Sequence, residues 1–106
     1  MLDVYPVVLD WVVAVRGVVD QVAVRDRHLA DQLSRSSSSV VLNLAEGMGG
    51  FGAVKRNSYR VALREMRESV AAVDLATRLG LATPLDDVVT DKQSRIVGTL
   101  VRLAMK

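Results

Sequence analysis

The sequence has no cysteine, two prolines, one histidine and four aromatic residues among 106 residues. The absence of cysteine excludes disulfide bonds and thiolate metal sites, and it suits the reducing cytoplasm, where we expect this protein. The single histidine argues against a histidine-rich metal site. With so few aromatic side chains, stacking on many unpaired bases is not expected either.

Long uninterrupted apolar runs are also missing. The first twenty residues are the most apolar part of the chain, but Asp3, Asp10, Arg16 and Asp20 interrupt them, and a membrane span needs roughly 20 apolar residues. No basic segment precedes them, as a secretory signal would require. The net charge of +2 and the pI near 9.4 are too mild to identify a nucleic-acid partner. We therefore expect one domain over residues 1–106, with no membrane association.

Apolar residues recur at helical intervals in four segments separated by three short breaks. The predicted helices cover about Asp3 to Val22, Arg27 to Glu46, Arg56 to Leu79, and a last segment that begins at Thr83 and Pro84. Short connections favour antiparallel neighbours. The sequence therefore predicts an all-α fold, an antiparallel up-down-up-down four-helix bundle.

Residues at the predicted breaks match the preferences of helix ends. Asp26 is a suitable N-cap for the second helix, and Gly47 is expected to end that helix in a left-handed conformation. Gly80 is the expected stop of the third helix. Thr83 followed by Pro84 reads as the cap and first position of the fourth.

The serine run at 36–39 has two interpretations. Its composition suggests a linker, but Leu29, Leu33, Ser36, Val40 and Leu44 follow the spacing of one helical face. We favour the helix, because small side chains are tolerated where another helix approaches closely. Small residues also repeat at intervals of seven in the third helix, at Ala62, Ser69 and Ala76.

The first predicted helix has a wider apolar arc than one bundle core requires. One face carries valines and Trp11, and four further residues extend the arc past half the circumference: Tyr5, Leu9, Val12 and Val19. A subunit contact through these four residues is the natural explanation, with a strongly buried central helix as its competitor. We therefore expect a homo-oligomer.

Basic residues gather in a narrow sector of the third predicted helix. They are Arg56, Arg60, Arg64, Arg67 and Arg78, with Lys55 at the start. Arginine forks bind phosphate oxygens in bidentate geometry, so Lys55, Arg56, Arg60, Arg64 and Arg67 form the candidate nucleic-acid-binding surface. The alternative is a solvated face whose arginines pair with Glu65, Glu68 and Asp74.

The remaining polar groups do not indicate catalysis. The glycines at 47, 49, 50 and 52 lack the Gly-Lys-Ser/Thr ending of a phosphate-binding loop. His28, with Asp31 or Glu46, lacks the paired Glu-x-x-His motifs of di-iron bundles, so no metal, cofactor or catalytic residue is predicted. Four side chains are instead expected to form a structural polar network inside or between bundles: Arg35, Asn43, Glu46 and Glu68.

Several of these residues also belong to a recognisable pattern. Gln32-Leu33-Ser34-Arg35, Ser39 and Asn43-Leu44-Ala45-Glu46-Gly47 are followed by Tyr59, Ala62, Glu68 and Ala76 to Gly80. Over about Tyr5 to Leu81 the chain resembles the bacterial four-helix bundle proteins named after the 23S rRNA intervening sequences that encode some of them. It is distantly similar to the accessory variability determinant of diversity-generating retroelements.

This resemblance implies a homo-oligomer, with a pentamer favoured, and a nucleic-acid role without catalysis. Together with the basic sector, it leads us to expect a non-enzymatic scaffold or adaptor that binds RNA or another nucleic acid. The alternative is a purely structural module that binds a protein partner and no nucleic acid.

Overall fold

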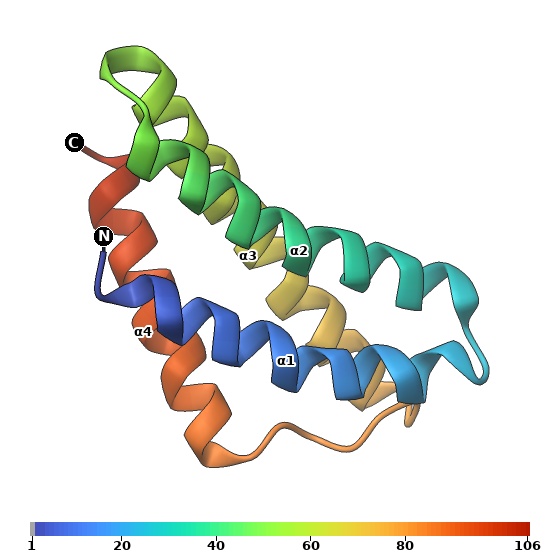
Figure 1. Ribbon diagram of the computed structural model, residues 1–106. Coiled ribbons are helices and arrows are strands. Elements are labelled where there is room, and N and C mark those ends of the chain that lie inside the picture. The colour runs from blue at the N-terminus through green and yellow to red at the C-terminus, as the bar shows by residue number, and fades with distance from the viewer. Residues whose placement is uncertain (1) are drawn as a thin grey trace.

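A computed structural model describes residues 2–106, and four helices make up most of them (Figure 1). They are α1 (Val4–Ala23), α2 (Arg27–Gly49), α3 (Gly52–Arg78) and α4 (Asp87–Ala104). Consecutive helices run in opposite directions, which confirms the predicted all-α up-down-up-down bundle. The most extensive packing is between α2 and α3, while α4 lies against both α3 and α1.

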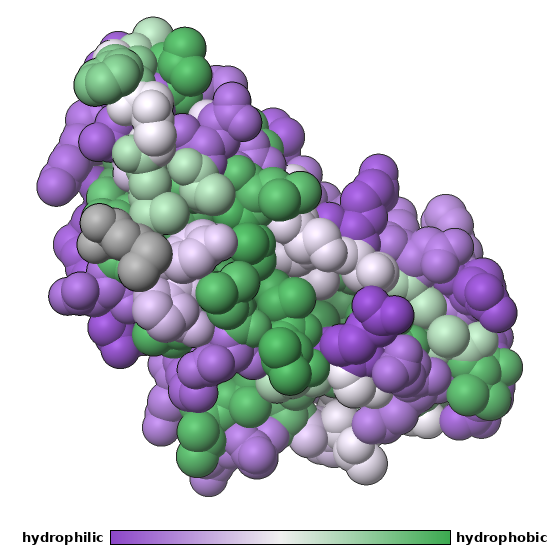
Figure 2. All heavy atoms as spheres, in the orientation of Figure 1, coloured by the Kyte–Doolittle hydropathy of each residue, from purple (hydrophilic) through white to green (hydrophobic). Residues whose placement is uncertain are grey.

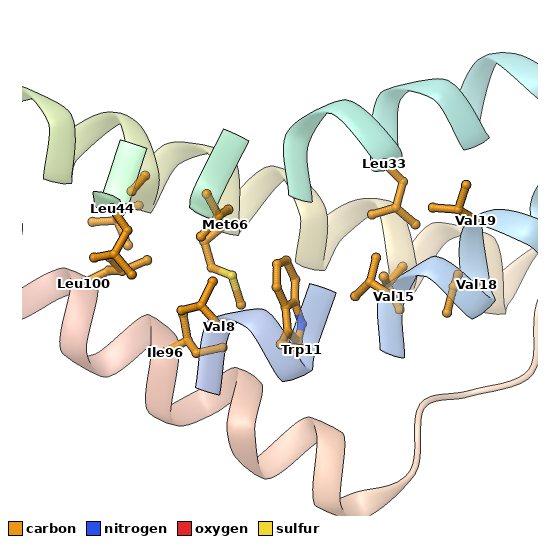
Figure 3. Close-up of a cluster of buried hydrophobic side chains, with 14 of the residues drawn as sticks. Val8, Trp11, Val15, Val18, Val19, Leu33, Leu44, Met66, Ile96 and Leu100 are labelled. Atoms are coloured by element: carbon orange, nitrogen blue, oxygen red, sulfur yellow. The ribbon is translucent and has the colours of Figure 1, made fainter. Parts of the chain in front are cut away.

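The core is one cluster of buried side chains to which all four helices contribute. The predicted inner face of α1 is buried throughout, at Val4, Val8, Trp11, Val15, Val18 and Val22. Figure 3 shows the Trp11 indole in the middle of this cluster, between Met66 and Val15. Its Nε1 donates a hydrogen bond to Gln93 Oε1 at 3.1 Å, which ties α1 to α4.

The serine run lies inside α2, as the helical spacing predicted. Ser36 and Ser37 are buried, and Ser36 Oγ lies 2.7 Å from Ser69 Oγ of α3. Ser69 donates to the carbonyl of Glu65 at 2.9 Å, so Ser36 is the donor to Ser69, and Ser36 Oγ also lies 3.3 Å from the carbonyl of Leu33. These hydroxyls are therefore satisfied without larger side chains, which lets α2 and α3 pack closely along the Ala62, Ser69 and Ala76 positions.

The α2–α3 connection is shorter than predicted. The structure continues α2 to Gly49 and begins α3 at Gly52. Gly47 is therefore not a left-handed cap, because it lies inside α2 and is buried. Its role is steric: a Cβ at this position would lie 2.5 Å from Cε1 of Tyr59. Left-handed backbone occurs instead at Gly52, with φ of 54°, and at Gly80, with φ of 72° as expected.

The predicted start of the fourth helix was wrong. Thr83 and Pro84 lie in the preceding connection, and α4 begins at Asp87 after Asp86, whose carboxylate accepts from the Val89 amide. The Thr83 amide and hydroxyl donate instead to Gln21 Oε1, at 2.8 and 3.2 Å. These hydrogen bonds attach the connection to the end of α1, a contact that local sequence preferences do not include.

Candidate nucleic-acid interface

The basic sector of α3 is a solvent-exposed stripe. Lys55, Arg56, Arg60, Arg64 and Arg67 are all exposed, and we call these five residues the basic stripe. Their spacing places the four arginines along one side of α3, with Lys55 at the start of the helix on the side of Tyr59, and Arg56 and Arg67 are about 16 Å apart along the helix axis. One carboxylate, that of Glu65, lies among them in the sequence. Asp74 interrupts the same face before Arg78, so the basic stripe belongs to the first half of α3.

Two members of the basic stripe have partners within the chain. Arg64 Nη2 lies 3.8 Å from Glu65 Oε1, a long ion pair on the surface, and such pairs contribute little. Arg60 Nε donates to the backbone carbonyl of Ala104 at 3.4 Å. Arg60 thereby attaches α3 to the last turn of α4, a role that helical spacing alone does not reveal. Its two Nη groups remain as donors.

The alternative interpretation, in which the arginines pair with Glu65, Glu68 and Asp74, holds for one arginine of the basic stripe. Within residues 2–106, Lys55, Arg56 and Arg67 form no ion pair, and neither Glu68 nor Asp74 pairs with a basic residue. Most of the basic stripe therefore lacks a direct ion-pair partner within residues 2–106. A surface of this kind attracts anions, and its attraction falls as salt concentration rises.

The predicted polar network does not form within one chain. Asn43 donates to the carbonyl and hydroxyl of Ser39 one turn earlier, both at 2.9 Å. Arg35, Glu46 and Glu68 are exposed and make no side-chain hydrogen bond among the described residues. Asn43 therefore stabilises its own helix, and the three charged side chains are exposed in the single chain, so that a polar network between bundles stays a prediction. The buried polar pair is Ser36 with Ser69, which sequence reasoning missed.

The expected interface residues of α1 divide into two groups. Val19 is 8% exposed and belongs to the core, so its assignment to the outer surface was wrong. Tyr5 and Val12 are half-buried, and Leu9 is exposed together with Val13, which is 74% exposed. Figure 2 shows hydrophobic side chains gathered over the middle of the face that α1 presents.

A hollow of about 240 Å³ lies between α1 and α2 on this side of the bundle. Val12, Val13 and Val19 line it from α1, and serines of α2 line it opposite. We call Tyr5, Leu9, Val12 and Val13 the α1 apolar surface. A cluster of exposed apolar residues beside a groove is typical of a protein contact.

Other kinds of site find little support in the described part of the chain. No group of three or more histidine, aspartate or glutamate side chains there is placed to hold a metal ion. Likewise, none of its helices is both long and apolar enough to cross a membrane. His28 is exposed on α2 and belongs to no such group among residues 2–106.

Neither a protein-family model nor a curated protein matches this sequence. Among solved structures, the chain is similar to a protein of unknown function from the S23 ribosomal protein family of Bacteroides thetaiotaomicron VPI-5482, whose crystal structure was determined at 1.70 Å resolution. The TM-score is 0.83 at 19% sequence identity, over 97% of this chain and 99% of that chain. This chain therefore shares the complete four-helix fold of that protein.

Proposed function

We propose that this protein is a non-enzymatic, oligomeric scaffold that binds RNA through the basic stripe of α3. The observation that carries the proposal is the exposure of five basic side chains along half a helix, of which only Arg64 forms an ion pair within residues 2–106, although Glu65 and Glu68 lie beside Arg64 and Arg67 in the sequence. The family name of the similar structure, which refers to a ribosomal protein, points in the same direction. The sequence resemblance to proteins encoded in 23S rRNA intervening sequences adds to it.

The stripe suits contacts with phosphates better than readout of bases. Arginine and lysine neutralise phosphate oxygens irrespective of sequence, and the stripe has no aromatic residue beside Arg64 or Arg67 on which a base could stack. At about 18 Å from Lys55 to Arg67, the stripe is long enough for several consecutive phosphates of one strand. We therefore expect binding that depends strongly on salt and weakly on sequence.

A charge reversal tests this surface. Arg64→Glu combined with Arg67→Glu should weaken RNA binding by about tenfold or more, because each phosphate that is no longer neutralised keeps its counterions instead of releasing them. The slope of log affinity against log salt should also become shallower, by roughly 0.7 to 0.9 for each such phosphate. Fluorescence anisotropy with two RNAs of unrelated sequence measures both quantities.

The matched control reverses the same number of charges elsewhere. Arg27 and Arg95 are exposed on α2 and α4 and make no ion pair within residues 2–106. An Arg27→Glu, Arg95→Glu variant should therefore retain most of the affinity. If the wild-type protein binds neither RNA at low salt, the purely structural alternative with a protein partner replaces this proposal.

The oligomer is proposed to form through the α1 apolar surface. A homo-oligomer would repeat the basic stripe around the assembly and strengthen binding through multiple contacts. A pentamer is the assembly that the sequence resemblance favours. The exposed apolar side chains of α1 and the adjoining groove support a subunit contact here.

Val13→Glu is expected to dissociate the assembly. The Val13 side chain is 74% exposed in the single chain, so a carboxylate there should leave the fold intact while being unfavourable in an apolar contact. Val88→Glu, at a similarly exposed valine on α4, is the control. Light scattering should give a mass near 11.5 kDa for Val13→Glu and a multiple of it for the wild type and the control. A wild-type mass of one chain would contradict this proposal.

A further inference from the structure

Three segments far apart in the sequence meet around a small hollow at one end of the bundle. The hollow has a volume of about 230 Å³ and is lined by Leu2, Lys55, Arg56, Tyr59, Leu103 and Lys106. Three of the six lining residues are cationic, and none is acidic. We call it the cationic hollow. Four other hollows among the described residues contain at most one cationic residue each.

The three cations of this hollow lack counterions. Lys55, Arg56 and Lys106 form no ion pair with any carboxylate of residues 2–106. Leu2 and Leu103 form apolar walls beside them. Like charges gathered against apolar walls focus the local electric field and concentrate anions. The hollow therefore favours binding of an anion that has more than one negative charge.

Arg60 holds one side of the hollow in place. Its hydrogen bond to the Ala104 carbonyl attaches the last turn of α4 to α3. Lys106 follows Ala104 by two residues and lines the hollow together with Lys55 and Arg56. Arg60 is in this respect a positioning residue for Lys106, in addition to its place in the basic stripe.

Tyr59 supplies a neutral donor. Tyr59 is 3% exposed and its ring lies against Gly47, but its hydroxyl makes no hydrogen bond within the described chain and is not sealed away from solvent. Since Tyr59 lines the hollow, the hydroxyl is available there. Burial raises the pKa of Tyr59, so the hydroxyl keeps its proton at neutral pH and can donate a hydrogen bond to an anion.

We propose that the cationic hollow binds a phosphomonoester, specifically the terminal phosphate of an RNA strand whose following phosphates lie along the basic stripe. A terminal phosphate has more charge than a phosphodiester and offers three oxygens, which matches several donors arranged around a concavity. A phosphodiester inside a strand is linked on both sides, so the strand would have to pass into and out of a hollow of only about 230 Å³, whereas a terminal phosphate is linked on one side. The inference rests on the proposed RNA-binding function and adds a strand end and a direction to it.

The test compares one short single-stranded RNA with and without a terminal phosphate, with each strand end modified in turn. Wild-type protein should bind the RNA phosphorylated at one of its ends about ten- to hundredfold more tightly than the unphosphorylated RNA, as expected for charge-assisted hydrogen bonds. Lys55→Gln and Tyr59→Phe should each reduce this ratio. Tyr59→Phe keeps the ring over Gly47, so circular dichroism should report an unchanged fold.

Arg67→Gln is the matched comparison, because Arg67 lies in the basic stripe but does not line the hollow. This variant should lower the affinity for both RNAs by the same factor and leave the ratio of the two affinities unchanged. RNA binding with the same affinity for phosphorylated and unphosphorylated strands overturns the inference and leaves the proposed function standing. Absence of binding to either strand overturns the proposed function and this inference with it.

A second measurement locates the phosphate and identifies its source. In nuclear magnetic resonance spectra, a nucleoside monophosphate should shift the backbone amides of Lys55, Arg56, Tyr59 and Lys106, and the unphosphorylated nucleoside should not. Shifts confined to other residues overturn the inference. If the free monophosphate binds as tightly as the phosphorylated strand, a small nucleotide rather than a strand end is the ligand, and the assignment to RNA ends is wrong.

Discussion

Trp11→Ala is expected to lower the free energy of unfolding by about 3 to 5 kcal/mol, the usual cost of truncating a large buried aromatic side chain. Trp11 has no exposed surface and lies where α1 meets the other helices. Its removal leaves a cavity that the surrounding close-packed side chains fill only in part. Because small domains have a total stability of about 5 to 15 kcal/mol, much of the protein should then be unfolded on mild heating.

Trp11→Phe separates the two contributions of this residue. Phenylalanine keeps much of the buried volume but loses the Nε1 donor to Gln93. We expect a cost below that of the alanine variant, since the hydrogen bond accounts for about 1 kcal/mol and Gln93 is half-buried and near solvent. Urea denaturation followed by circular dichroism measures both variants. Equal midpoints for Trp11→Ala and wild type would contradict the central position of this side chain.

The second large effect is expected at Gly47. Alanine there would place its Cβ 2.5 Å from Cε1 and 2.7 Å from Cδ1 of the buried Tyr59 ring. The ring must shift, and overpacking of this kind costs about 1 to 3 kcal/mol. This outweighs the gain of about 1 kcal/mol that alanine normally provides over glycine inside a helix. The displaced Tyr59 should also reduce binding at the cationic hollow.

Gly17 provides a matched control of opposite sign. It lies within α1, is exposed, and has no atom within 4 Å of the position that a Cβ would occupy. Gly17→Ala should therefore stabilise the protein by up to about 1 kcal/mol. Thermal unfolding of both variants gives the comparison. Stabilisation of Gly47→Ala as large as that of Gly17→Ala would show that Tyr59 does not pack on Gly47.

Much of the fold could be predicted because it depends on local periodicity. The buried face of α1 follows directly from apolar spacing, and the serine run is helical for the same reason. The Asp26 cap, which accepts from the Leu29 amide at 3.0 Å, needs four consecutive residues and no others. Such features use information contained within one or two helical turns.

The candidate site was predictable in part. Exposure of Arg56, Arg60, Arg64 and Arg67 agrees with their position away from the apolar face of α3, whereas Lys55 lies in register with that face and is exposed because it belongs to the first turn of the helix. The hydrogen bond from Arg60 to Ala104 was not foreseeable, because it joins residues 44 positions apart. The cationic hollow was missed for the same reason. Lys106, which is far from Lys55 and Arg56 in the sequence, contributes to it.

The sequence by itself determined the number, approximate bounds and inner faces of the helices, because each depends on the spacing of apolar and capping residues along a short segment. Only the tertiary structure decided what Gly47, Val19 and Thr83 do. A Tyr59 ring from α3 occupies the space beside Gly47, the core includes Val19, and Gln21 of α1 binds Thr83. These outcomes depend on which side chain of another helix packs against each residue. The spacing of residues within one segment does not specify that neighbour.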